Sequence, residues 1–132
     1  MLSINKYFSR LEARLETSSL VAIYTMGIDK KSDDIALISG KVEFRDGSVL
    51  NFKEFVENTG RWVQKYKYAY NYRLHKETIF RYDNAPDPNA KDLKTYPHHK
   101  HLCGGAIVVS RPVALNDVLD EIETVIISDM NQ

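Results

Sequence analysis

The chain has 132 residues, of which 43% are hydrophobic and 27% are charged, and Lys+Arg balance Asp+Glu at 18 each. This length and composition predict one domain over residues 1–132 and exclude a disordered chain. No apolar run reaches the length of a membrane span, and the first residues lack the apolar centre of a signal peptide. We therefore expect a cytoplasmic protein that makes no contact with a membrane.

Charge is unevenly distributed along the chain. Residues 61–101 carry 9 basic and 4 acidic side chains, whereas residues 102–132 carry 1 and 5. A basic stretch with aromatic residues interleaved is typical of proteins that bind an anionic partner such as nucleic acid. An ordinary fluctuation in charge explains the same counts, so both interpretations stay open at this point.

The N-terminal third predicts one helix followed by strands. Apolar residues recur at helical spacing from Ile4 to Thr17, with Ser3 as the N-cap. β-Branched and aromatic residues favour a strand over 20–28, and partial alternation favours another over 35–45. Asp46-Gly47 then predicts a hairpin turn.

The centre of the chain carries the clearest strand pattern. Residues 49–57 fit a strand, and 53–57 also fit a short helix. Residues 61–74 are clearer, because every second residue from 66 to 72 is a tyrosine: Tyr66, Tyr68, Tyr70 and Tyr72. A strand would place these four rings on one face and a basic row on the other. The rings form a buried face in one interpretation; in the other they stack on unpaired bases, with Lys65, Lys67 and Arg73 near phosphates.

The C-terminal half adds short strands and a helix. Residues 78–83 predict a strand, and 84–97 contain three prolines and predict a loop without regular structure. Residues 98–102 are expected to be extended, 106–110 a further strand and 112–128 a terminal helix. The order implies an α+β fold, in which an N-terminal and a C-terminal helix cover one face of an antiparallel, strongly twisted sheet of about five to seven strands.

Three of the four histidines lie in the run His98-His99-Lys100-His101. In an extended segment His99 and His101 share one face with Cys103, and His98 shares the other with Lys100. Two imidazoles and a thiol at alternate positions suit a metal such as zinc, so His99, His101 and Cys103 are the ligands that a metal site would use. A structural site needs a fourth ligand, for which His75 and Asp83 are the candidates. A solvated basic loop is the plainer alternative.

The same run suits acid–base cleavage of an RNA phosphodiester. Such cleavage needs no protein nucleophile, because the ribose 2′-OH can attack the adjacent phosphorus. One histidine would take the 2′-OH proton, another would protonate the leaving 5′-oxygen, and Lys100 with Arg81 would neutralise the phosphorus. Asp83 would pair with Arg81 or hold an imidazole in one tautomer, unless the two form only a surface ion pair. Pairing of 80–83 with 98–102 would bring these groups together under the long loop.

Two motifs together resemble the TumE-type toxins of prokaryotic type II toxin–antitoxin systems. They are Phe80-Arg81-Tyr82-Asp83-Asn84-Ala85-Pro86 and Pro97-His98-His99-Lys100-His101, and the resemblance covers most of the chain. The continuation Leu102-Cys103-Gly104-Gly105 departs from it. The resemblance implies a cytoplasmic prokaryotic protein that is neutralised by a cognate DNA-binding antitoxin and acts on RNA or translation.

We therefore expect a toxin that is a metal-independent endoribonuclease with no cofactor. The expected catalytic residues are Arg81, Asp83, His98, His99, Lys100 and His101, and the expected RNA-binding residues are Lys65, Lys67, Arg73 and Tyr82. Alanine at His99 or His101 is expected to abolish cleavage and leave the fold intact. A non-catalytic module that binds RNA or a protein, or a His/Cys metal-binding domain, is the alternative. RNA and the antitoxin are the expected partners, and we allow for a homodimer.

Overall fold

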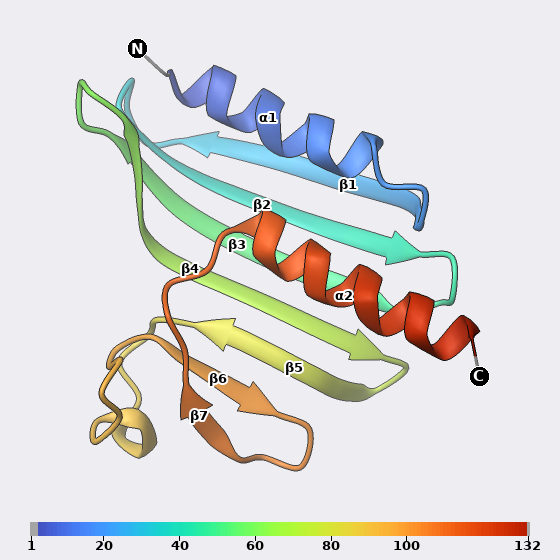
Figure 1. Ribbon diagram of the computed structural model, residues 1–132. Helices are drawn as coiled ribbons and strands as arrows, with labels where there is room; N and C mark the ends of the chain where they lie inside the picture. The colour runs from blue at the N-terminus through green and yellow to red at the C-terminus, as the bar shows by residue number, and fades with distance from the viewer. Residues whose placement is uncertain (1–2, 132) are drawn as a thin grey trace.

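The computed structural model describes residues 3–131, and its centre is one antiparallel sheet whose seven strands follow one another in chain order (Figure 1). The strands are β1 (Val21–Lys30), β2 (Ile35–Phe44), β3 (Val49–Asn58), β4 (Val63–Leu74), β5 (Glu77–Asp83), β6 (His99–Leu102) and β7 (Ile107–Val109). The helices α1 (Ile4–Glu16) and α2 (Leu115–Met130) both lie on one face of this sheet. This arrangement confirms the predicted α+β fold. No helix within residues 3–131 is long and apolar enough to cross a membrane.

Local signals in the sequence explain most element boundaries. The Ser3 hydroxyl accepts a hydrogen bond from the backbone N–H of Lys6 (3.1 Å) and caps α1 as predicted. Gly47 adopts φ +89° in the β2–β3 turn, a conformation that favours glycine. The ambiguous segment 49–57 forms the strand β3, because β2 and β4 flank it and supply its backbone partners. Strand pairing thus decided what local propensity left open.

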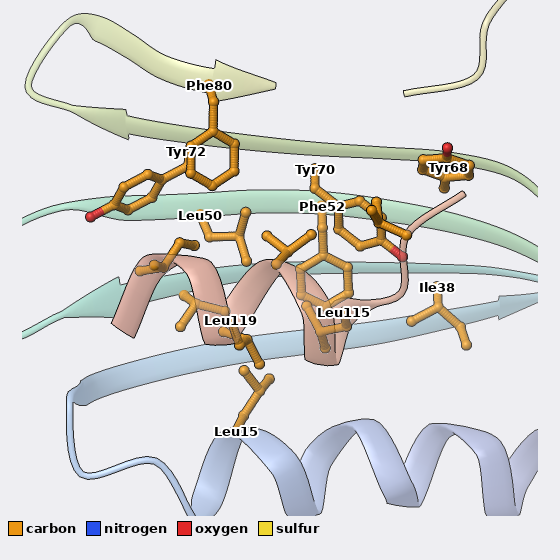
Figure 2. Close-up of a cluster of buried hydrophobic side chains, with 14 of the residues drawn as sticks. Leu15, Ile38, Leu50, Phe52, Tyr68, Tyr70, Tyr72, Phe80, Leu115 and Leu119 are labelled. Carbon is orange, nitrogen blue, oxygen red and sulfur yellow. The ribbon is translucent and has the colours of Figure 1, made fainter. Parts of the chain in front are cut away.

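The core lies between the sheet and the two helices, and large rings fill much of it (Figure 2). Tyr68, Tyr70 and Tyr72 are buried on the face that the helices cover. Tyr66 is not, because a register shift between Phe55 and Val56 turns it to the opposite face, where its ring lies 5.0 Å from that of Phe55. The prediction of four tyrosines on one face was therefore wrong for Tyr66.

The same shift turns Lys65 toward the helices, where it joins a buried polar network. Its ammonium donates to the hydroxyl of Tyr70 (2.5 Å) and to the carbonyl of Val113 (2.5 Å). Glu54, which is fully buried, accepts hydrogen bonds from Tyr70 (2.6 Å) and from Tyr7 of α1. Burial lowers the pKa of Lys65, although the negative charge of Glu54 opposes that shift. The network fixes α1 and the start of α2 to the sheet.

Gly40 in β2 has no room for a side chain, and we expect Gly40→Ala to destabilise the protein. A Cβ there would lie 2.5 Å from Cε1 of Phe52, a buried ring that stacks on Tyr70. Overpacking of this kind costs about 1–3 kcal/mol, measurable by urea unfolding. The matched control is Gly27→Ala in the neighbouring β1, where a Cβ meets nothing within 4 Å. Equal stability of the two variants would contradict this account of the core.

Candidate functional site

The candidate site lies on the sheet face opposite the helices, where β5 pairs with β6. Asp83 stands opposite His99, and Arg81 opposite His101. Because side chains alternate along a strand, these four groups point to the same face. The predicted pairing of the Arg81 strand with the histidine strand is confirmed.

Burial divides the four residues into a buried pair, Asp83 and His99, and an exposed pair, His101 and Arg81. Asp83 is 4% exposed and His99 is 1% exposed, whereas the side chains of His101 and Arg81 are 28% and 44% exposed. The loop between β5 and β6, which contains a 3-10 turn at Pro88–Ala90, lies against β7. The two ends of this loop contact the buried pair, through the backbone N–H of Ala85 and the carbonyl of Pro97. Only His101 and Arg81 are thus presented to a ligand.

Hydrogen bonds fix the orientation of the buried pair, Asp83 and His99. His99 Nδ1 lies 2.8 Å from the carbonyl oxygen of Pro97, which can only accept, so this nitrogen carries the proton. The other ring nitrogen, Nε2, lies 3.0 Å from Nε2 of His101 and 3.1 Å from Oδ1 of Asp83. Asp83 also accepts hydrogen bonds from Nε of Arg81 (2.9 Å) and from the backbone N–H of Ala85 (3.1 Å). Two imidazoles and one carboxylate therefore converge on one point.

His98 and Lys100 point to the other face, toward the helices. The hydroxyl of Tyr68 lies 2.8 Å from Nδ1 of His98, and Lys100 donates to Glu121 (2.8 Å). Burial lowers the pKa of His98, as do the charges of Lys65 and His99, and burial with the charge of Asp83 raises the pKa of Tyr68 to about 12. Tyr68 therefore donates to a neutral His98. The division of the histidine run into two faces is confirmed, but the six candidate catalytic residues do not form one site.

The candidate RNA-binding residues are divided in the same way. Lys67 and Arg73 lie on the outer face of the sheet, which is the face opposite the helices and the one that carries the candidate site. Lys65 lies inside the polar network, and the hydroxyl of Tyr82 donates to Glu121 of α2 (2.6 Å). The structure thus keeps Lys65 and Tyr82 away from any ligand on the outer face.

Sequence reasoning missed two basic residues that lie on the outer face, Lys41 and Lys53. Together with Arg81 they line a hollow of about 670 Å³ that crosses β1 to β5, and its described lining contains no acidic side chain. Small residues at its floor, Gly27, Ser39 and Ala69, leave the backbone open. Strand alternation places Lys41 and Lys53 on this face, but only the strand order brings them to the same hollow as Arg81.

The hollow leads to the histidines, since Arg81 also lines a second depression of about 560 Å³ beside His101. Cys103 borders that depression on the β6–β7 turn, where it is exposed. Within residues 3–131, Asp83, His99 and His101 form the group whose ligand atoms all lie within 4.8 Å of one another, and Cys103 is not part of it. The prediction that Cys103 completes the ligand set was wrong, because the turn at Gly104 and Gly105 carries its thiol away from the strand.

The fold and the site define an α+β protein whose polar site sits on an open, basic sheet face. A family model described as Toxin TumE matches residues 11–127, a range that includes the whole site. The chain belongs to the TumE toxin family, which confirms the resemblance seen in its two motifs and implies an antitoxin partner in general. No curated protein and no solved structure matches the chain.

Proposed function

We propose that this protein is the toxin of a type II toxin–antitoxin pair and that it cleaves RNA at the outer sheet face. One observation carries the proposal: the Arg81, Asp83, His99 and His101 cluster opens onto a hollow lined by basic side chains. Histidine and arginine beside a basic surface suit a phosphodiester substrate. The partner that we propose is a cognate DNA-binding antitoxin in the same prokaryotic cytoplasm.

The proposed reaction uses fewer residues than the sequence suggested. The ribose 2′-OH attacks the adjacent phosphorus, and His101, the exposed imidazole, takes its proton. Arg81 neutralises the charge that gathers on the phosphorus, the P–O5′ bond breaks, and water protonates the leaving 5′-oxygen. Asp83 and His99 are positioning residues, because they are buried and act through Arg81 and His101. The products are a 2′,3′-cyclic phosphate and a 5′-hydroxyl.

The proposed RNA path follows the hollow from β1 toward His101. Lys41 and Arg81 lie in one row across the strands and Lys53 lies in the next row, so an unpaired strand can lie along the hollow with its phosphates near these groups. A phosphate at Lys41 would share the ammonium with Glu43, which lies 3.5 Å from it. Asn51 and Asn71, which also line the hollow, offer amide groups for hydrogen bonds to ribose or bases.

Lys53→Gln is expected to weaken RNA binding uniformly across sequences. Removing one phosphate contact should also reduce the slope of log affinity against log salt by about 1. Fluorescence anisotropy with a labelled single-stranded RNA at several salt concentrations measures both quantities. The control is Lys76→Gln in the exposed β4–β5 turn, outside the hollow. Equal losses in the two variants would place the RNA elsewhere.

The direct test of the proposed function is incubation of the purified protein with RNA in EDTA. Cleavage under these conditions supports the metal-independent reaction. Binding without cleavage would instead favour the second candidate, a non-catalytic RNA-binding module on the same basic face, and the hollow is the observation that favours it. Cleavage that disappears in EDTA would overturn the metal-free step.

A further inference from the structure

We propose that Asp83, His99 and His101 bind a divalent transition-metal ion of the zinc class. The inference goes beyond RNA cleavage and holds whether or not RNA is the substrate. It rests on three ligand-capable side chains from two paired strands that direct one atom each to a common point.

The shortest distances between the three side chains are close to those of a metal site, with a different carboxylate oxygen of Asp83 nearest each histidine. Nε2 of His99 lies 3.0 Å from Nε2 of His101 and 3.1 Å from Oδ1 of Asp83, and Nε2 of His101 lies 3.5 Å from Oδ2 of Asp83. Ligand atoms about 2.0–2.2 Å from a tetrahedral zinc ion lie about 3.3–3.6 Å apart. Shifts of a few tenths of an ångström would therefore place an ion between the three groups.

The chemistry of the three atoms favours a positive centre. His99 donates from Nδ1 to Pro97, so Nε2 is the nitrogen that can offer a lone pair to an ion, and the carboxylate of Asp83 can only accept. A proton can join two of these atoms, whereas a divalent ion joins all three. Metal-bound histidines commonly donate their second ring N–H to a backbone carbonyl, as His99 does here. Arg81 and the backbone N–H of Ala85 likewise donate hydrogen bonds to the carboxylate of Asp83 and so fix its orientation.

The three ligands indicate the class of ion, and their surroundings indicate where a fourth ligand of the ion would bind. Two imidazoles and one carboxylate suit Zn²⁺, Co²⁺ or Ni²⁺ better than Mg²⁺ or Ca²⁺, which prefer oxygen. Three protein ligands leave a fourth position, and His101 faces the depression beside Arg81. The positive charge of Arg81 there suits an anionic fourth ligand such as a phosphate oxygen.

The test is titration of EDTA-treated, desalted protein with ZnCl₂ by calorimetry, in the absence of RNA. We expect one ion per chain, and a loss of affinity of more than about 100-fold in His101→Ala, because even outer-shell changes cost about 10–100-fold. His101 is partly exposed, so this variant should fold, and circular dichroism checks that it does. Asp83→Asn should also weaken binding.

Two variants act as matched controls. His75→Asn removes a histidine from the β4–β5 turn, and asparagine tolerates the positive φ there; Cys103→Ser removes the thiol that borders the depression. Both should bind Zn²⁺ like the parent, and CoCl₂ should give a visible spectrum without a thiolate charge-transfer band. The inference is overturned if binding is not stoichiometric, if His101→Ala binds like the parent, or if Cys103→Ser loses the ion.

The ion site and the proposed cleavage can fail independently. The titration contains no RNA, so an absence of ion binding leaves the metal-free reaction standing. An ion bound by His101 occupies that imidazole as a ligand, so Zn²⁺ in excess over the EDTA should lower the rate of cleavage. A requirement of cleavage for Zn²⁺ would support the ion site and overturn the metal-free step.

Discussion

His101→Ala is expected to lower the rate constant of RNA cleavage in EDTA by about 10²–10⁴-fold, the usual effect of losing a general acid–base group. His101 is the imidazole of the cluster that a ligand can reach, and His99 behind it is 1% exposed. Arg81 and the basic hollow remain in the variant, so RNA binding should change little. Single-turnover cleavage of a labelled RNA measures the rate constant, and anisotropy measures the binding.

The matched control for this prediction is His98→Ala, which removes the neighbouring histidine from the opposite face. It should cleave RNA at nearly the parent rate. Equal losses in the two variants, or full activity of His101→Ala, would contradict the assignment. His99→Ala is unsuitable as a test, because His99 is buried and its loss should also cost stability.

Lys65→Met is expected to reduce the free energy of unfolding by about 1–3 kcal/mol, because it removes the donor to Tyr70 and to the carbonyl of Val113 and the positive charge that lies nearest the buried Glu54 in this network. Methionine retains much of the apolar stem of lysine, so the loss in free energy of unfolding reflects the removed ammonium group more than a change in side-chain volume. The hydroxyls of Tyr7 and Tyr70 would still donate to Glu54 but would not neutralise it. Urea unfolding of the parent and the variant measures the difference.

A double variant separates charge from packing in this network. Glu54→Gln combined with Lys65→Met removes both charges, which the hydroxyl of Tyr70 links, and replacing two buried opposite charges together is often better tolerated than removing one. The double variant should therefore be more stable than Lys65→Met alone. If the double variant loses as much free energy of unfolding as the two single variants lose together, the two charges do not stabilise each other.

Local patterns in the sequence predicted much of the fold. The helical spacing of 4–17, the Asp46-Gly47 turn and the alternation from Tyr68 to Tyr72 each depend on neighbours along the chain, and the structure confirms them. Alternation also divided the histidine run correctly between two faces. The bulge at Phe55/Val56 was beyond such reasoning, because it depends on how β3 and β4 align across the sheet.

The site was only partly predictable, because it also depends on contacts between segments that are distant in the sequence. Arg81, Asp83 and the histidines stand in motifs, and one pairing of strands brings them together. The position of Cys103 depends on the geometry of a glycine turn, and the burial of His99 depends on the path of a long loop. Lys41 and Lys53 join Arg81 only through the order of the strands, which composition does not encode.

The proposed cleavage of RNA at the outer sheet face depends on the ribose 2′-OH, so a substrate without that hydroxyl tests it. An RNA oligonucleotide and the same oligonucleotide with a 2′-deoxyribose at the cleaved position are incubated with the protein in EDTA, and the product ends are identified by mass spectrometry. We predict that only the first is cut, with a 2′,3′-cyclic phosphate and a 5′-hydroxyl as its new ends. Cleavage of the 2′-deoxy oligonucleotide at a similar rate would contradict the account.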